Sequence, residues 1–159
     1  LGLHQLTLDS TFLQNLRITH CDTLNVLDCH IVELSKLQFF DLPFQHLKDI
    51  RLVGLELTDA NFKTAKKEFW NCESLDLSRN DLSDATLQEL RVLRFLEYLD
   101  LEQNEQVTGT GFEQWSPTKL SVLRMSQTGL NMAGLDAITK KLTILFFDIS
   151  GNNISRLPA

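Results

Sequence analysis

The sequence predicts an α/β fold built from about seven short repeats, each with one strand, a turn and a returning segment. The best-formed repeat is Cys72–Leu82, which follows the pattern L-x-x-L-x-L-x-x-N-x-L with a cysteine at the first apolar position. Leu75 and Leu77 are two residues apart, so in a strand both side chains point to the same face. Asn80 follows at the turn, where its amide group can donate to and accept from inward backbone groups.

The second observation is that this pattern recurs at a nearly constant interval. After Cys72, further copies follow in three steps of 24 residues, starting at Leu96, Leu120 and Ile144. Looser copies precede it in steps of 25, 23 and 21 residues, starting at Leu47, Leu24 and Leu3. A different register, starting at Leu13 with Cys21 in the Asn position, also fits the first third of the chain. The spacing favours the start at Leu3.

The third observation is helical periodicity in the segments between the expected strands. Helices are expected over residues 58–70, 83–93 and 131–141. Asp59 is expected to cap the first helix, and Ser83 or Asp84 the second, because short polar side chains accept hydrogen bonds from the first helical turn. Gly109 and Gly111 predict a looser segment in the following repeat.

These spacings resemble the leucine-rich repeat family over nearly all 159 residues. The resemblance implies a curved solenoid with repeats of 21–25 residues, a parallel sheet on its concave face and a role in protein recognition. One domain is expected over residues 1–159. The convex half of the last repeat is missing after Ile154, so the domain is expected to be truncated or uncapped at that end.

Composition argues against several other classes of protein. The net charge of -6 and the pI near 5.1 argue against nucleic acid as a partner. No apolar run approaches the roughly 18 residues that suggest a membrane span, so no membrane insertion is expected. The sequence has no paired histidines at metal-ligand spacing, no phosphate-binding glycine loop and no nucleophile elbow. The chain is therefore expected not to be an enzyme and to need no cofactor or metal.

Two cellular locations stay open. The run Asp59–Leu82 resembles repeats of extracellular Toll-type receptors and of secreted insect leucine-rich immune proteins, which implies an extracellular chain or a receptor ectodomain. Asn153 begins a glycosylation sequon that agrees with secretion. Three cysteines cannot all pair, and the Cys-rich end caps of extracellular family members are missing, which favours the cytoplasm. Cys29 and Cys72 are expected in the core, and Cys21 in a turn or convex segment.

Strand alternation predicts which residues face the concave side, because positions three, five, seven and eight of each repeat point away from the core. The candidate binding residues are Asp49, Arg51, Asp76, Arg79, Tyr98, Asp100, Glu102, Val122, Arg124, Phe146 and Asp148. Tyr98, Val122 and Phe146 share the third position in consecutive repeats and form an apolar stripe. An aspartate at the fifth position is also explained by solubility alone, and a C-terminal flank that covers the stripe is the alternative to binding.

The predicted function is a non-enzymatic protein-recognition module for innate-immune recognition or signalling, with a protein or peptide bound on the concave face. An intracellular scaffold or regulatory subunit is the first alternative. The second is a structural assembly module that forms a homodimer through its uncapped ends.

Overall fold

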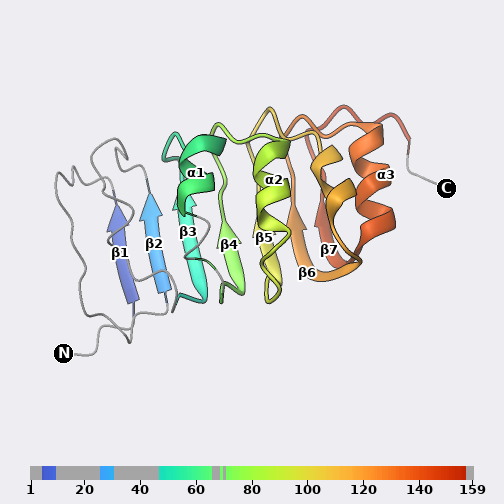
Figure 1. Cartoon of the computed structure of the whole chain (residues 1–159). Helices are drawn as coiled ribbons and strands as arrows, with labels where there is room; N and C mark the ends of the chain where they lie inside the picture. Colours follow the sequence, from blue (N-terminus) through green and yellow to red (C-terminus); the bar gives the residue numbers. More distant parts are fainter. Residues whose placement is uncertain (1–4, 10–25, 31–46, 66–68, 70, 157–159) are drawn as a thin grey trace.

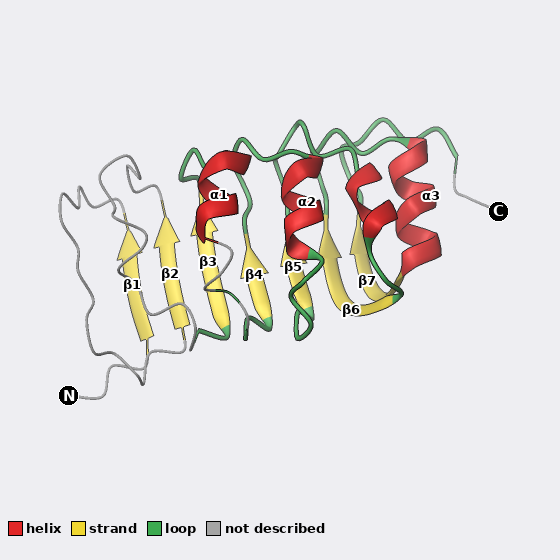
Figure 2. Cartoon of the chain, in the orientation of Figure 1, coloured by secondary structure: helices red, strands yellow, loops and turns green. Residues whose placement is uncertain are grey.

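The fold is a single parallel sheet with one layer of helices (Figures 1 and 2). The computed structural model describes residues 5–9, 26–30, 47–65, 69 and 71–156. Seven strands lie in sequence order, and each pairs in parallel with the next. They are β1 (Gln5–Asp9), β2 (Val26–His30), β3 (Asp49–Val53), β4 (Ser74–Asp76), β5 (Tyr98–Asp100), β6 (Thr118–Arg124) and β7 (Leu142–Asp148). The predicted α/β class with a parallel sheet is confirmed.

The predicted repeat register is also confirmed. The third positions of the repeats are direct neighbours across the sheet, in the order Gln5, Val26, Asp49, Ser74, Tyr98, Val122 and Phe146. The start at Leu3 therefore describes the pairing of β1 and β2. The strand of the rival register would fall on residues 10–25, which lie outside the described residues.

The helices all lie on one face of the sheet, in front of the strands in Figure 2. They are α1 (Asp59–Ala65), α2 (Asp84–Leu90), the 3-10 helix η5 (Thr110–Gln114) and α3 (Met132–Lys141). Ser83 caps α2 by accepting from Ala85 N, and Asn131 caps α3 by accepting from Gly134 N. The looser segment expected at Gly109 begins η5 with a left-handed φ of 87°, a conformation that glycine adopts without steric cost.

Asp59 does not act as predicted. Its carboxylate accepts from the backbone N–H groups of Ser83 and Thr86 at 3.0 and 3.2 Å, and from both hydroxyls. It therefore supports the start of α2, one repeat later, instead of its own helix. Burial works to raise the pKa of Asp59, but these hydrogen bonds outweigh it and hold the pKa below its ordinary value.

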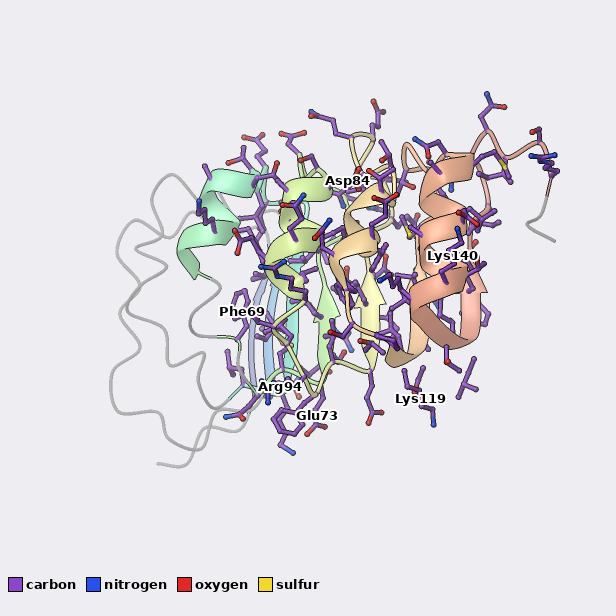
Figure 3. All side chains as sticks on the ribbon, turned by 45° about the vertical axis from the view of Figure 1, so that its right-hand side comes forward. Phe69, Glu73, Asp84, Arg94, Lys119 and Lys140 are labelled. Carbon is purple, nitrogen blue, oxygen red and sulfur yellow. The ribbon has the colours of Figure 1, made fainter. Side chains whose placement is uncertain are left out.

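Asp84 repeats this arrangement one repeat further along. It accepts from Gly109 N at 2.9 Å and from the hydroxyls of Thr108 and Thr110, at the start of η5. Figure 3 shows Asp84 at the upper end of the helix layer. Each acid thus joins two neighbouring repeats.

The core lies between the sheet and the helices. Cys72, Leu75 and Leu77 are fully buried, as predicted, and the leucines of α2 pack over them in the same hydrophobic cluster. Trp115 is 3 % exposed and satisfies its indole N–H by donating to Leu87 O at 2.7 Å. Burial raises the pKa of the Cys72 thiol to about 12, which suits an inert core residue.

Asparagine side chains satisfy inward backbone groups at the turns, as the sequence predicts, and they also form a second connection between repeats. Asn80 accepts from Leu55 N and Leu57 N of the preceding repeat at 2.9 and 3.0 Å. Its amide NH₂ donates to Leu52 O and Leu77 O. Asn104 and Asn152 make the corresponding backward bonds in later repeats. The buried turns are thereby satisfied by side chains.

Gly134→Ala is expected to destabilise the protein by about 1–3 kcal/mol or more. A Cβ at Gly134 would lie 1.9 Å from Thr108 O and 2.8 Å from Gly109 Cα, so backbone would have to move. Helix propensity alone predicts the opposite sign, a gain of about 1 kcal/mol. Urea unfolding of this variant beside Ala133→Gly, at an exposed position of the same helix, separates the two effects. Stabilisation by Gly134→Ala would contradict the close packing of α3 on η5.

Candidate functional site

The candidate site lies on the face of the sheet opposite the described helices, which we call the open face. The predicted residues differ in exposure. Arg51, Arg79, Arg124 and Phe146 are exposed, whereas Asp49, Asp76, Tyr98, Glu102, Val122 and Asp148 are partly buried, and Asp100 is buried. The expectation that Asp100 is a solvent-facing binding residue is wrong, because only 4 % of it is exposed.

Three of these aspartates have a structural role at the ends of their strands. Asp76, Asp100 and Asp148 each accept a hydrogen bond from the backbone N–H two residues later, at 2.9–3.0 Å. Such a bond closes a tight local turn. It explains an aspartate at the fifth position of the repeat without any ligand. The position of the aspartate two residues before the donor N–H is visible in the sequence. Asp148 also has a pKa below its ordinary value, first because of the hydrogen bonds from Ser150.

Asp100 is the centre of a small polar cluster. The Tyr98 hydroxyl donates to its Oδ2 at 3.2 Å, and an Arg124 guanidinium nitrogen lies 3.9 Å from the same oxygen. Desolvation by burial raises the pKa of Asp100. Burial, followed by the charge of Asp100, also raises the pKa of Tyr98 to about 12. Tyr98 and Asp100 therefore hold each other in place on the open face.

Tyr98, Val122 and Phe146 form what we call the apolar row. They occupy neighbouring positions on β5, β6 and β7. The side chains that alternate with them, Leu99 and Leu123, point into the core and are fully buried. Phe146 is 52 % exposed and the other two are partly exposed, so the row faces outward as the strand alternation predicts. The Arg124 guanidinium lies 5.8 Å from the centre of the Phe146 ring, within cation–π range.

The remaining predicted residues lie apart from the apolar row. Asp49 and Arg51, on β3, form an ion pair of 3.5 Å with each other, and Ser74 donates to Asp49 at 3.4 Å. Arg79 lies in the turn after β4, where it helps to line a polar depression with Gln103 and Gln127. The structure therefore divides the predicted binding residues into an apolar group at β5–β7 and separate charged residues near β3 and β4.

The turns that follow the strands hold a feature that the sequence analysis did not find. Arg79, Gln103, Gln127 and Gly151 all have positive φ, between 51° and 69°. The first three donate their N–H groups to carbonyls of the next repeat at 2.8–3.0 Å. Only Gly151 carries a local signal for this conformation, because the left-handed region disfavours other residues.

Two features are absent from the described part of the chain. No three His, Cys, Asp or Glu side chains gather there in a way that could hold a metal ion. No helix among the described residues is both long and apolar enough to cross a bilayer. The side chains of Cys21 and Cys29 lie outside this part of the chain, and Asn153 of the sequon is exposed.

Comparisons with known proteins add no identification. No protein-family model matches the chain, and no curated protein matches its sequence.

Proposed function

We propose that the chain is a leucine-rich repeat solenoid in which the open face is the concave face. The near-constant repeat interval, the in-register parallel strands and the asparagine bonds between repeats support this proposal. The left-handed turns at equivalent positions support it too, because they give each repeat the same path. A chain built in this way forms one domain.

We propose further that this domain is a non-enzymatic protein-recognition module that binds its partner at the apolar row. One observation carries the proposal: Phe146 is 52 % exposed on a sheet face, in line with Tyr98 and Val122. Aromatic side chains beside an arginine are the composition of binding hot spots, whereas buried charges are rare there. Arg124 and Asp148 supply a charged rim.

We propose innate-immune recognition outside the cell as the setting. The sequence resemblance at Asp59–Leu82 is its main support, and the exposed Asn153 sequon is compatible with it. Mass spectrometry of the protein isolated from its natural source is expected to show the added mass of one N-glycan on Asn153. The Asn153→Gln variant should lack this added mass. An unmodified Asn153 together with reduced, unpaired thiols would favour the cytoplasmic scaffold instead.

The Tyr98→Ala/Phe146→Ala double variant is expected to bind native partners more weakly by about 1–3 kcal/mol for each hot-spot side chain, because it removes both aromatic anchors. Phe146→Ala should change folding little, since its side chain is 52 % exposed, whereas Tyr98→Ala also removes a hydrogen bond to the buried Asp100. Urea unfolding of the double variant checks that it is still folded. Quantitative capture of partners by the wild type and the variant measures the difference.

The matched control is Val92→Ala/Phe95→Ala, which removes two exposed apolar side chains at 40 % and 60 % exposure after α2. This control should bind as well as the wild type. Undiminished capture by the Tyr98→Ala/Phe146→Ala variant would place the binding site away from the open face.

A further inference from the structure

The charges beside the apolar row are mostly negative. At the fifth position, β4, β5 and β7 carry Asp76, Asp100 and Asp148, and β6 carries Arg124. Asp100 is buried and already meets Arg124, so it offers little to a partner. Asp76 and Asp148 are partly exposed, and neither forms an ion pair within the described part of the chain. Arg51 and Arg124 lie directly across from Asp76 and Asp148 on the neighbouring strands, but their guanidinium groups pair with Asp49 and Asp100. The two carboxylates therefore flank the row without an ion pair of their own.

The other charges nearby do not cancel these two acids. Glu102 follows β5 and adds a further negative charge, while Arg79 faces the polar depression in its turn. Arg124 is the positive group closest to the row, and it lies between the Asp100 carboxylate and the Phe146 ring. The whole chain has a net charge of -6, so its long-range field also favours a cationic ligand.

The spacing of the two acids matches an extended peptide that crosses the strands. Asp76 on β4 and Asp148 on β7 are three strands apart, which is about 14 Å at the usual spacing of about 4.8 Å. Residues i and i+4 of an extended chain are also about 13–14 Å apart. Residue i+2 then lies roughly 7 Å from β4, level with the gap between β5 and β6. The apolar row lies two residues, or about 6.6 Å, along the strands from the two acids, a distance that a lysine or arginine side chain can span from a peptide lying over the row.

The shape of the row suits an apolar side chain at that central position. Val122 is smaller than the aromatic side chains on either side, so a partner group can approach the sheet more closely there. The Tyr98 ring is held by its hydrogen bond to Asp100, and the Phe146 ring lies against Arg124. Side chains held in place lose less conformational entropy on binding.

We propose that the partner presents an extended basic segment in which an apolar residue is flanked, two residues away on each side, by lysine or arginine. The apolar residue contacts the apolar row, and the two basic residues meet Asp76 and Asp148. This inference rests on the proposed function and specifies the chemistry of the partner at the same site.

The first test is an NMR titration of the chain with the capped peptide Arg-Ser-Leu-Ser-Arg. The expected result is a set of shift changes confined to backbone amides of β4–β7, with an affinity that falls as salt screens the charges. Three peptides serve as controls: Glu-Ser-Leu-Ser-Glu reverses the charge, Arg-Ser-Ser-Ser-Arg removes the anchor, and Arg-Arg-Leu-Ser-Ser keeps the composition but changes the spacing. Each should bind more weakly. Equal or tighter binding of the acidic peptide would overturn the inference.

The second test uses Asp76→Asn and Asp148→Asn. Asparagine keeps an oxygen for the hydrogen bonds from Ser78 N and Ser150 N, so the turns should persist while the charge is lost. Each substitution should weaken Arg-Ser-Leu-Ser-Arg about two- to five-fold, the range expected for an exposed ion pair. The matched control, Asp136→Asn, removes an exposed carboxylate from α3 on the helix side and should leave the affinity unchanged.

The outcomes separate this inference from the proposed function. Unchanged affinity in the Asp76→Asn/Asp148→Asn double variant would overturn the basic-segment inference alone, provided that Tyr98→Ala/Phe146→Ala still loses its native partners. Undiminished capture by that aromatic variant would instead refute the proposed binding site. Sedimentation could also show self-association that Phe146→Ala abolishes, which would assign the face to a second copy of the chain and overturn the basic segment.

Discussion

Leu77→Ala is expected to lower the free energy of unfolding by about 2–5 kcal/mol. Leu77 is fully buried at the inward side of the repeat that contains β4, in the middle of the sheet, so its loss leaves a cavity that the neighbouring repeats can only partly fill. The loss should spread to the repeats on both sides, because each repeat is stabilised by its neighbours. Urea unfolding followed by circular dichroism measures the change.

Leu145→Ala is the matched control for this experiment, since it makes the same substitution at a side chain that is 75 % exposed. Its effect should stay within about 0.5 kcal/mol. A loss below about 1 kcal/mol for Leu77→Ala, or equal losses for the two variants, would contradict the placement of Leu77 in the core.

Asn104→Ala is expected to cost about 2–6 kcal/mol, because two buried backbone groups lose a partner at about 1–3 kcal/mol each. Asn104 is fully buried; its Oδ1 accepts from Leu82 N at 3.1 Å and its NH₂ donates to Leu101 O at 3.0 Å. It also donates to Leu77 O, which keeps a second donor in Asn80. Denaturant unfolding is the appropriate measurement.

Thr128→Ala, at the equivalent position one repeat later, should cost only about 1 kcal/mol. Its hydroxyl donates to Met125 O, but that carbonyl also accepts from the Asn152 amide, which remains in the variant. The group that loses a partner is Leu130 N, whose bond to the hydroxyl is 3.3 Å long. Equal losses at the two positions, or a larger loss at Thr128, would contradict the role assigned to the asparagine. Asn153→Ala, at an exposed asparagine, controls for the general effect of losing an amide.

The strand register could be predicted because it is a property of sequence spacing. Parallel neighbours in register require each repeat to return the chain to the same height, so equal steps along the sequence become direct neighbours in space. The sequence therefore predicted that Tyr98, Val122 and Phe146 share one row, and the pairing of β5, β6 and β7 agrees. The Ser83 cap of α2 was predictable for a different reason, because a cap is made within one helical turn.

The exposure of the candidate site could be predicted only in part. Strand alternation places Asp100 on the open face, but its burial depends on Tyr98 from the same strand and on Arg124 from the next repeat. The turn bonds of Asp76 and Asp148 are local, and they were recognisable from an acid two residues before the turn. The sequence also could not separate the apolar row from the charged residues near β3 and β4. That separation depends on ion pairs such as Asp49–Arg51, which form only in the folded chain.

The repeat interval, the strand register and the inward leucines were thus determined by the sequence itself, because periodic burial follows directly from the order of apolar residues. The tertiary structure decided how neighbouring repeats are joined. Asp59 and Asp84 bind groups that are 24–27 residues away, and the left-handed turns at Arg79 and Gln103 donate to the carbonyls of the next repeat. In each of these contacts, a carboxylate or a residue with positive φ bonds to a group one full repeat away. A pattern of neighbouring residues in the sequence therefore cannot predict the contact.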